Sequence, residues 1–211
     1  MDIITGVGVL DKAMNVLRSV ADSPRSLGEL QQTADLPRAT AHRLAVALEQ
    51  HGLLRRDVEG RFELGLGLVP LGQAASERFP LVELARPVLE SLRDTTGESV
   101  QLFVREGVFR RCVLSLESTH GLRWIVPDGA LLPLDVGSAG RVLSGETSRS
   151  GWIQSIGERE AGVASVSAAV TGVDGATVAA VSLSGPIERL SRQPGKRFGH
   201  AVVAAARRIV T

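Results

Sequence analysis

The sequence is poor in cysteine and aromatic residues: it has one cysteine, Cys112, and no tyrosine, and aromatics make up 3% of its 211 residues. One cysteine excludes an intrachain disulfide. The alternating apolar and polar neighbours of Cys112 indicate a small buried side chain in a reducing compartment. With so few aromatics, we expect the cores to consist of Leu, Val and Ala.

Long apolar segments are also missing. No window reaches the roughly 18 apolar residues that a membrane span needs. The first residues, MDIITGVGVLDKAMNVL, include acidic side chains and lack the apolar centre of a signal peptide. The sequence therefore predicts a soluble, cytoplasmic protein with no membrane partner.

Enzyme motifs are absent as well. There is no Gly-x-Ser-x-Gly elbow, no complete dinucleotide fingerprint and no phosphate loop. The four histidines are dispersed and lack metal-ligand spacing: His42, His51, His120 and His200. We expect no catalytic residue, cofactor or metal, and a small-molecule enzyme stays the less favoured alternative.

Net charge gives no sign of nucleic-acid binding. The chain carries +1, and residues 1–78 hold nine basic against ten acidic residues. This balance leaves open a winged-helix module that binds proteins rather than DNA. Basic residues nevertheless gather locally, because residues 37–61 hold five arginines against three acids.

The first 65 residues predict a winged helix-turn-helix. Apolar residues recur at helical spacing over residues 9–21. Ser26 and Glu29 form a capping box that opens a second short helix. A third helix, residues 37–51, begins with proline at its first position. Two short strands around an acid–glycine turn follow and make a hairpin.

The third helix has two distinct faces. One stripe is apolar and must pack on the first two helices: Ala41, Leu44, Ala45 and Leu48. The first turn and the opposite face carry the residues expected to meet DNA: Arg38, Ala39, Thr40, His42 and Arg43. Three hairpin arginines are expected along the phosphates: Arg55, Arg56 and Arg61. By periodicity alone, a helical bundle with a solvated arginine face remains an alternative.

The rest of the chain predicts a linker helix over residues 66–79 and an α+β domain over residues 80–211. A long amphipathic helix comes first, and then the period changes to two. Cys112, Leu114 and Leu116 are expected on one face of a strand. Two further strands and an alanine-rich helix near the C-terminus complete the domain.

Four serines gather on one face of the last predicted hairpin. Val-Asp-Gly-Ala at residues 173–176 predicts a two-residue turn between apolar runs. That register places serines opposite each other on one face: Ser165 opposite Ser184, and Ser167 opposite Ser182. The serines form either a polar floor for a ligand or pairs that bond only to each other. No run of arginines faces them in the sequence, which predicts modest affinity.

Three segments together resemble the IclR family of bacterial transcription regulators: GVGVLDKAMNVLRSV, SLGELQQTADLPRATAHRLAVALEQHGLLRRD and GRFELGLGLVPLG. AAVSLSGPIERL near the C-terminus resembles it too, so the resemblance runs from about Gly6 to Arg208. It implies an effector domain related in fold to GAF modules, dimers made through the N-terminal part, and often tetramers. SIGEREAGVASVSAAV looks most like an actinobacterial branch linked to amino-acid metabolism.

The resemblance also implies site residues. Thr40, His42 and Arg43 match the family's recognition helix. The family's effector pocket matches four serines: Ser155, Ser165, Ser182 and Ser184. Many relatives carry cysteine at the position of Ser165 and aspartate at that of Ser155, so this chain lacks a thiol and a carboxylate there. Gly137 and Ser138 match the start of a helix whose free amides can hold a carboxylate.

Two more features concern this domain. Trp124 lies in a loop that can close over the pocket or pack in the core. Relatives usually carry a longer, partly helical stretch where this sequence has only residues 146–150, so either the protein lacks that segment or the sequence omits part of it. We expect a sequence-specific repressor, a dimer or tetramer, that binds a double-stranded DNA operator. It should be controlled by a small carboxylate or amino-acid-related metabolite.

Overall fold

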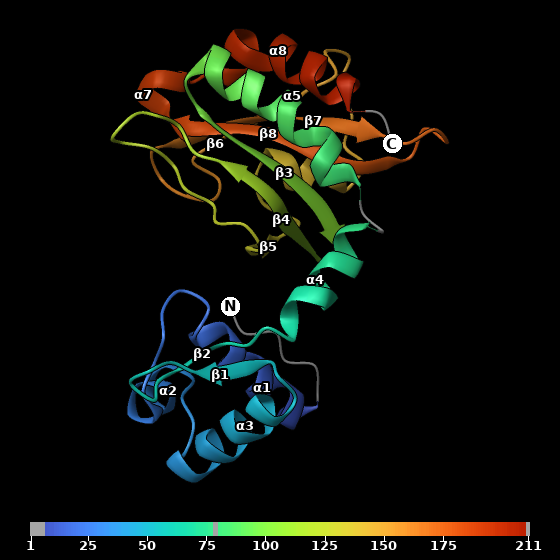
Figure 1. Cartoon of the computed structure of the whole chain (residues 1–211). Helices are drawn as coiled ribbons and strands as arrows, with labels where there is room; N and C mark the ends of the chain where they lie inside the picture. The colour runs from blue at the N-terminus through green and yellow to red at the C-terminus, as the bar shows by residue number, and fades with distance from the viewer. Residues whose placement is uncertain (1–6, 78–79, 210–211) are drawn as a thin grey trace. The chain divides into compact units, whose positions relative to one another are not determined.

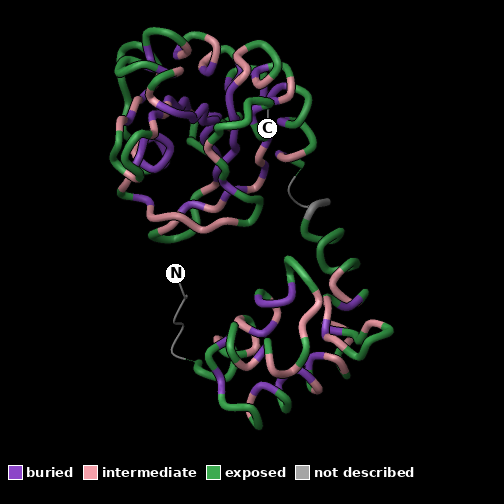
Figure 2. Tube along the Cα trace, turned by 90° about the vertical axis from the view of Figure 1, so that its left-hand side faces the viewer, coloured by how far each residue is buried: buried purple, intermediate pink, exposed green. Residues whose placement is uncertain are grey.

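The computed structural model describes residues 7–77 and 80–209. The chain divides into two compact units, residues 1–78 and residues 79–211. Each unit has a buried interior of its own (Figure 2). Among the described residues, no helix is long and apolar enough to cross a membrane.

The N-terminal unit is a three-helix fold with a hairpin, as the sequence predicts (Figure 1). Its elements are α1 (Gly8–Ser19), α2 (Leu27–Thr33), α3 (Arg38–Gln50), β1 (Leu54–Arg56), β2 (Phe62–Leu64) and α4 (Leu68–Glu77). The predicted capping box opens α2, since the Ser26 amide donates to Glu29 Oε2 at 2.7 Å and Ser26 Oγ accepts from the Glu29 amide. Pro37 precedes α3 as its N-cap instead of occupying the first helical position.

The core of this unit fixes the orientation of α3. The four residues of the predicted apolar stripe are all buried and pack with Val16, Leu30 and Phe62. After α3 the chain turns at Gly52, whose φ of +69° is the left-handed conformation that glycine adopts without strain. The hairpin is thereby held against α3, with Leu54 and Phe62 buried beneath it.

The C-terminal unit is a six-stranded antiparallel sheet with helices on both faces. Its helices are α5 (Leu81–Thr96), α6 (Ser138–Leu143), α7 (Ile187–Leu190) and α8 (Pro194–Arg208). Its strands are β3 (Ser99–Glu106), β4 (Phe109–Leu116), β5 (Leu131–Pro133), β6 (Ile153–Ile156), β7 (Val163–Thr171) and β8 (Thr177–Pro186). The strand order is β5-β4-β3-β8-β7-β6. Helices α5 and α8 cover one face (Figure 1), and α6 packs on the other.

A β-bulge in β4 changes the face that we expected for Cys112. Leu102 pairs with Leu114, but the next residue, Phe103, pairs with Cys112, so Val113 is the extra residue. An extra residue reverses the alternation of side chains. Cys112 therefore packs on the α6 side, whereas Leu114 packs under α5 and α8, and the prediction of a shared face was wrong.

The predicted two-residue turn at residues 173–176 was also wrong. Strand β7 ends at Thr171 and β8 begins at Thr177, and a register shift lies at Val170/Thr171. The Gly172 amide donates to the Ala176 carbonyl at 2.9 Å, which closes a longer loop with Val173 exposed. The shift lies near the tip, so the register farther down the strands is the expected one.

Candidate functional site

The outward face of α3 is the first candidate surface. Arg38, Ala39, His42 and Arg43 are exposed and Thr40 is half-buried. Arg38 and Arg43 form no ion pair with any carboxylate in the described part of the chain. Because these two guanidinium groups are not neutralised by the protein, they are available to an external anion.

The hairpin arginines differ, because each is paired with an acid of the same unit. Arg55 contacts Glu63, its cross-strand neighbour, at 2.7 Å. Arg56 contacts Glu49 at 3.2 Å and lies 4.2 Å from the centre of the Phe62 ring. Arg61 contacts two acids, Asp57 at 2.8 Å and Glu59 at 3.2 Å. Exposed pairs of this kind open at little cost, so phosphate contact by the hairpin stays a prediction.

The second candidate site is a cavity of about 40 Å³ on the face of the sheet that α6 covers. All six residues predicted for the effector line it: Gly137, Ser138, Ser155, Ser165, Ser182 and Ser184. Trp124 lines it as well. The structure thus brings together six predicted residues that are spread over the sequence from Gly137 to Ser184.

The pairing of the serines follows the predicted register. Ser165 lies opposite Ser184, and Ser167 lies opposite Ser182, while Ser155 on β6 pairs with Ser165. Ser167 is fully buried below the cavity and is not among its lining residues.

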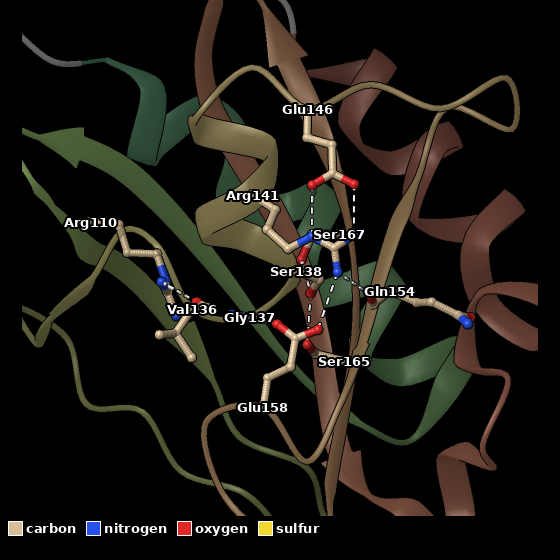
Figure 3. Close-up of polar contacts among 10 residues, drawn as sticks. All are labelled: Arg110, Val136, Gly137, Ser138, Arg141, Glu146, Gln154, Glu158, Ser165 and Ser167. Atoms are coloured by element: carbon tan, nitrogen blue, oxygen red, sulfur yellow. Dashed lines mark hydrogen bonds and ion pairs between the residues drawn. The ribbon is translucent and has the colours of Figure 1, made fainter.

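The hydroxyls of this face form a directed chain. Ser138 Oγ lies 2.7 Å from both Ser165 Oγ and Ser167 Oγ (Figure 3). Ser167 donates to Ser182 at 2.9 Å. Since each hydroxyl has one proton, Ser138 must donate to Ser167 and Ser165 to Ser138. The Ser182 proton then has no acceptor in the described hydrogen-bond network. Mutual bonding therefore satisfies most of the hydroxyls but leaves one donor.

The Gly137 amide is not free, contrary to our expectation. It donates to Glu158 Oε2 at 3.0 Å, and Glu158 Oε1 accepts from Arg141 at 3.1 Å. Arg141 also forms an ion pair with Glu146 at 2.6 Å, and this contact raises the pKa of Arg141. Figure 3 shows the Arg141 guanidinium between the carboxylates of Glu146 and Glu158. The loop after β6 folds back on the start of α6, and its carboxylate already occupies the amide that we had assigned to a ligand.

Two arginines that sequence reasoning missed line the same cavity, although no run of arginines in the sequence indicated them. Arg110 on β4 is 3% exposed, and Arg159 lies in the loop after β6. Desolvation, with a smaller contribution from the charge of Arg159, lowers the pKa of Arg110 to about 10. Desolvation likewise lowers the pKa of Arg159. Both stay charged at neutral pH, so the cavity is a cationic environment.

The bulge at Val113 explains how Arg110 reaches the cavity. It turns Arg110, together with Cys112, to the α6 side of the sheet. There Arg110 Nη1 donates to the carbonyls of Pro133 and Val136, the latter at 2.7 Å. Burial raises the pKa of the Cys112 thiol to about 12, so it is a packing residue rather than a nucleophile.

Two protein-family models match this chain. The model of the IclR helix-turn-helix domain matches residues 9–58. The model of the C-terminal domain of bacterial IclR transcriptional regulators matches residues 73–147 and 145–211. The chain belongs to the IclR family. The helix-turn-helix match lies in the N-terminal unit, and most of the C-terminal match lies in the six-stranded unit.

Individual IclR-family proteins agree with this assignment. The regulator KipR of Bacillus subtilis is 33% identical over 131 residues, which are 62% of this chain and about half, 52%, of KipR. The repressor IclR of Escherichia coli is 25% identical over 240 aligned positions, covering 95% of this chain and 88% of that protein. The fold matches a solved IclR homologue of Microbacterium hydrocarbonoxydans with a TM-score of 0.77, at 21% identity over 95% of this chain and 97% of that one.

The family match bears on the short stretch at residues 146–150. The C-terminal model matches in two pieces that meet at residues 145–147. The alignment with Escherichia coli IclR is longer than this chain's 211 residues, so it contains gaps in this chain. Both observations agree with an IclR domain that is shorter here between α6 and β6.

Proposed function

We propose that this IclR-family chain is a repressor that binds an operator through α3 and is controlled by a small carboxylate bound in the serine cavity. The observation that carries the DNA-binding part is the outward face of α3. It presents Arg38 and Arg43, which pair with no acid within residues 7–77 and 80–209, while the opposite stripe holds the helix on the core.

Helix α3 has the chemistry of a recognition helix. An α-helix fits the major groove, where arginine bonds to guanine, and threonine or histidine reaches base edges or phosphates. We assign base contact to Arg43 with help from Thr40 and His42. Arg38 in the first turn and the hairpin arginines Arg55, Arg56 and Arg61 are assigned to phosphates, which position a protein without specifying sequence.

We also propose a homodimer, or a tetramer built from it, on a pseudo-palindromic operator. Apolar side chains are exposed on α1, namely Val9, Leu10 and Met14, and around α4, namely Leu66, Val69 and Leu71. Contiguous exposed apolar groups indicate a protein interface. Two copies joined by a twofold axis read two half-sites that are about one helical turn of DNA apart.

The effector assignment is supported by the cavity's donors. Hydroxyls and two cationic guanidinium groups suit an anion that brings its own acceptors. The Microbacterium hydrocarbonoxydans homologue was solved in complex with 4-hydroxybenzoate, which is a carboxylate. For this chain we propose a small carboxylate or amino-acid-related metabolite and a role in amino-acid metabolism, in the cytoplasm where the chromosome lies.

A salt titration tests the DNA-binding part. Binding to the promoter of its own gene is measured by anisotropy, for wild type and for the triple variant Arg55→Ala, Arg56→Ala, Arg61→Ala. The slope of log Kd against log salt should be several units, and the variant should flatten it by about 0.9 unit per lost phosphate contact.

A second candidate, a protein-binding winged helix, is favoured by the net charge of −1 over residues 1–78 and by the paired hairpin arginines. It predicts no salt-dependent binding to the promoter. That result would overturn the repressor assignment. If the promoter binding of wild type depends on salt but the triple variant has the same slope, only the assignment of the hairpin arginines to phosphates is wrong.

A further inference from the structure

Arg110 is a buried cation that forms no ion pair within the part of the chain that the structure describes. It is 3% exposed and pairs with no carboxylate among residues 7–77 and 80–209. Its Nη1 bonds to two backbone carbonyls, but its Nε has no hydrogen-bond partner among the described residues. Burying a charge without an opposite charge is costly, and proteins compensate this cost with a paired ion. Among the described residues, only Asp135 favours the charged form of Arg110, and it does so without forming an ion pair.

Arg159 is a second cation of the same cavity. Its guanidinium lies 4.7 Å from the centre of the Trp124 ring, and no hydrogen bond or ion pair joins it to the described part of the chain. Glu160 is the one acid among the lining residues, and it is exposed. Its charge favours the charged form of Arg159 without forming an ion pair. Two separate guanidinium groups thus face one small cavity, and their charges oppose each other.

Gln101 on β3 supplies a neutral hydrogen-bond donor to the cavity. It is 1% exposed and lines the cavity, and its Oε1 accepts from Ser184 at 2.9 Å. Its Nε2 has no partner among the described residues. A buried amide donor without an acceptor costs about 1–3 kcal/mol, so an oxygen-rich ligand would satisfy it.

We propose that the effector is a short dicarboxylate, with one carboxylate bound to Arg110 and the other to Arg159, and with Gln101 Nε2 donating to one of its oxygens. This inference rests on the proposed effector role of the cavity and names the ligand class. Neither arginine forms an ion pair with a described acid, so two guanidinium groups can each bind one carboxylate of the same ligand. The cavity of about 40 Å³ is small and favours a short chain over a long one, with Arg159 beside exposed Glu160 at the solvent side.

The test compares two acids of equal chain length. Binding of succinate and of butyrate to the full chain is measured by calorimetry, because butyrate replaces one carboxylate with a methyl group. Succinate should bind about tenfold or more tightly than butyrate, since a bidentate arginine–carboxylate pair in a desolvated site is a strong interaction. The dicarboxylates from malonate to adipate and their 2-hydroxy derivatives define the best length.

Arg159→Gln is the informative variant, because Arg159 has no bond that the fold depends on. It should remove most of the preference for succinate and leave butyrate binding unchanged. Arg192→Gln, an exposed arginine outside the cavity, should leave both unchanged. Arg110→Lys keeps the charge but cannot hold a carboxylate through two parallel bonds, so it should weaken the binding of both acids.

Equal affinity for succinate and butyrate, or a preference that survives in Arg159→Gln, would overturn the dicarboxylate while leaving a monocarboxylate effector in place. If no dicarboxylate of the series binds with a Kd below about 1 mM, the inference is also wrong. The salt-dependent promoter binding described above is independent of these results, so the failure of one can be told from the failure of the other.

Discussion

The arginines of the effector cavity and those of the hairpin are in opposite situations. Arg110 and Arg159 are desolvated and have no carboxylate partner among the described residues, and the two charges oppose each other. The hairpin arginines are largely exposed, and each is already paired with an acid, as Arg55 is with Glu63 at 2.7 Å. The two cavity arginines, of which Arg110 is buried and Arg159 half-buried, are therefore available to an external anion, whereas the hairpin arginines are neutralised by their own domain.

This difference changes where anion binding should be sought. A count of arginines along the sequence favours the hairpin region, which holds three within seven residues. The ion pairs reverse that ranking. An arginine that must first break its ion pair with an acid contributes less free energy to the binding of a new anion. The strongest anion sites of this molecule should then be the cavity and the unpaired arginines of α3.

The largest expected effect is on stability at Arg110. Arg110→Ala leaves the buried carbonyls of Pro133 and Val136 without their donor, and the free energy of unfolding should fall by about 1–3 kcal/mol. Both tryptophans, Trp124 and Trp152, belong to the C-terminal unit. Urea unfolding followed by tryptophan fluorescence therefore reports on that unit alone.

Arg55→Ala is the matched control for this measurement. Its ion pair is exposed, so circular dichroism should show a loss of at most about 1 kcal/mol, and the fluorescence transition should not move. If Arg110→Ala unfolds at the wild-type urea concentration, the guanidinium does not hold these carbonyls and the contrast with the hairpin is lost.

The second prediction concerns α3. Arg43→Ala removes an unpaired arginine from the proposed recognition face, which should cost about 1–3 kcal/mol of operator binding and relax specificity at one position. A competition assay with single-base operator variants measures both effects. Binding as tight as that of wild type, with unchanged specificity, would remove Arg43 from the base contacts.

The smallest expected effect is a gain. Glu63→Gln removes the acid that faces Arg55 across the hairpin. The released guanidinium should strengthen operator binding by no more than about 1 kcal/mol and steepen the salt dependence by up to about one unit. Glu83→Gln, on α5 in the other unit, serves as the charge-matched control. Equal effects of the two substitutions would mean that only net charge matters and that the hairpin ion pair does not.

Periodicity predicted the parts that depend on regular geometry. The buried stripe of α3, with Leu44 and Leu48, follows from helical spacing. The opposed serines, such as Ser165 and Ser184, follow from strand register. Both predictions are confirmed because no extra residue interrupts the helix or the paired strands at these positions. The register shift at Val170/Thr171 lies beyond the serines, near the tip of the hairpin.

The cationic part of the site could not be predicted in the same way. Arg110 points into the cavity because one extra residue, Val113, reverses the alternation of β4, and nothing in the local sequence marks that bulge. Arg159 and Glu158 lie in a loop without a period. The one available signal was a charged residue two positions before Cys112 in a largely apolar strand, because that spacing places Arg110 on the same face as the buried Cys112.

Effector control of DNA binding is the central claim, and one titration tests it directly. Operator affinity of the full chain is measured by anisotropy with and without saturating succinate, or the tighter dicarboxylate found by calorimetry, for wild type and Arg159→Gln. The ligand should change the wild-type Kd for DNA by about 5–150-fold, in either direction, and should leave the variant nearly unchanged at the same concentration. A wild-type Kd that stays constant at saturation would contradict the account, because the cavity would then bind its ligand without controlling the DNA-binding helix.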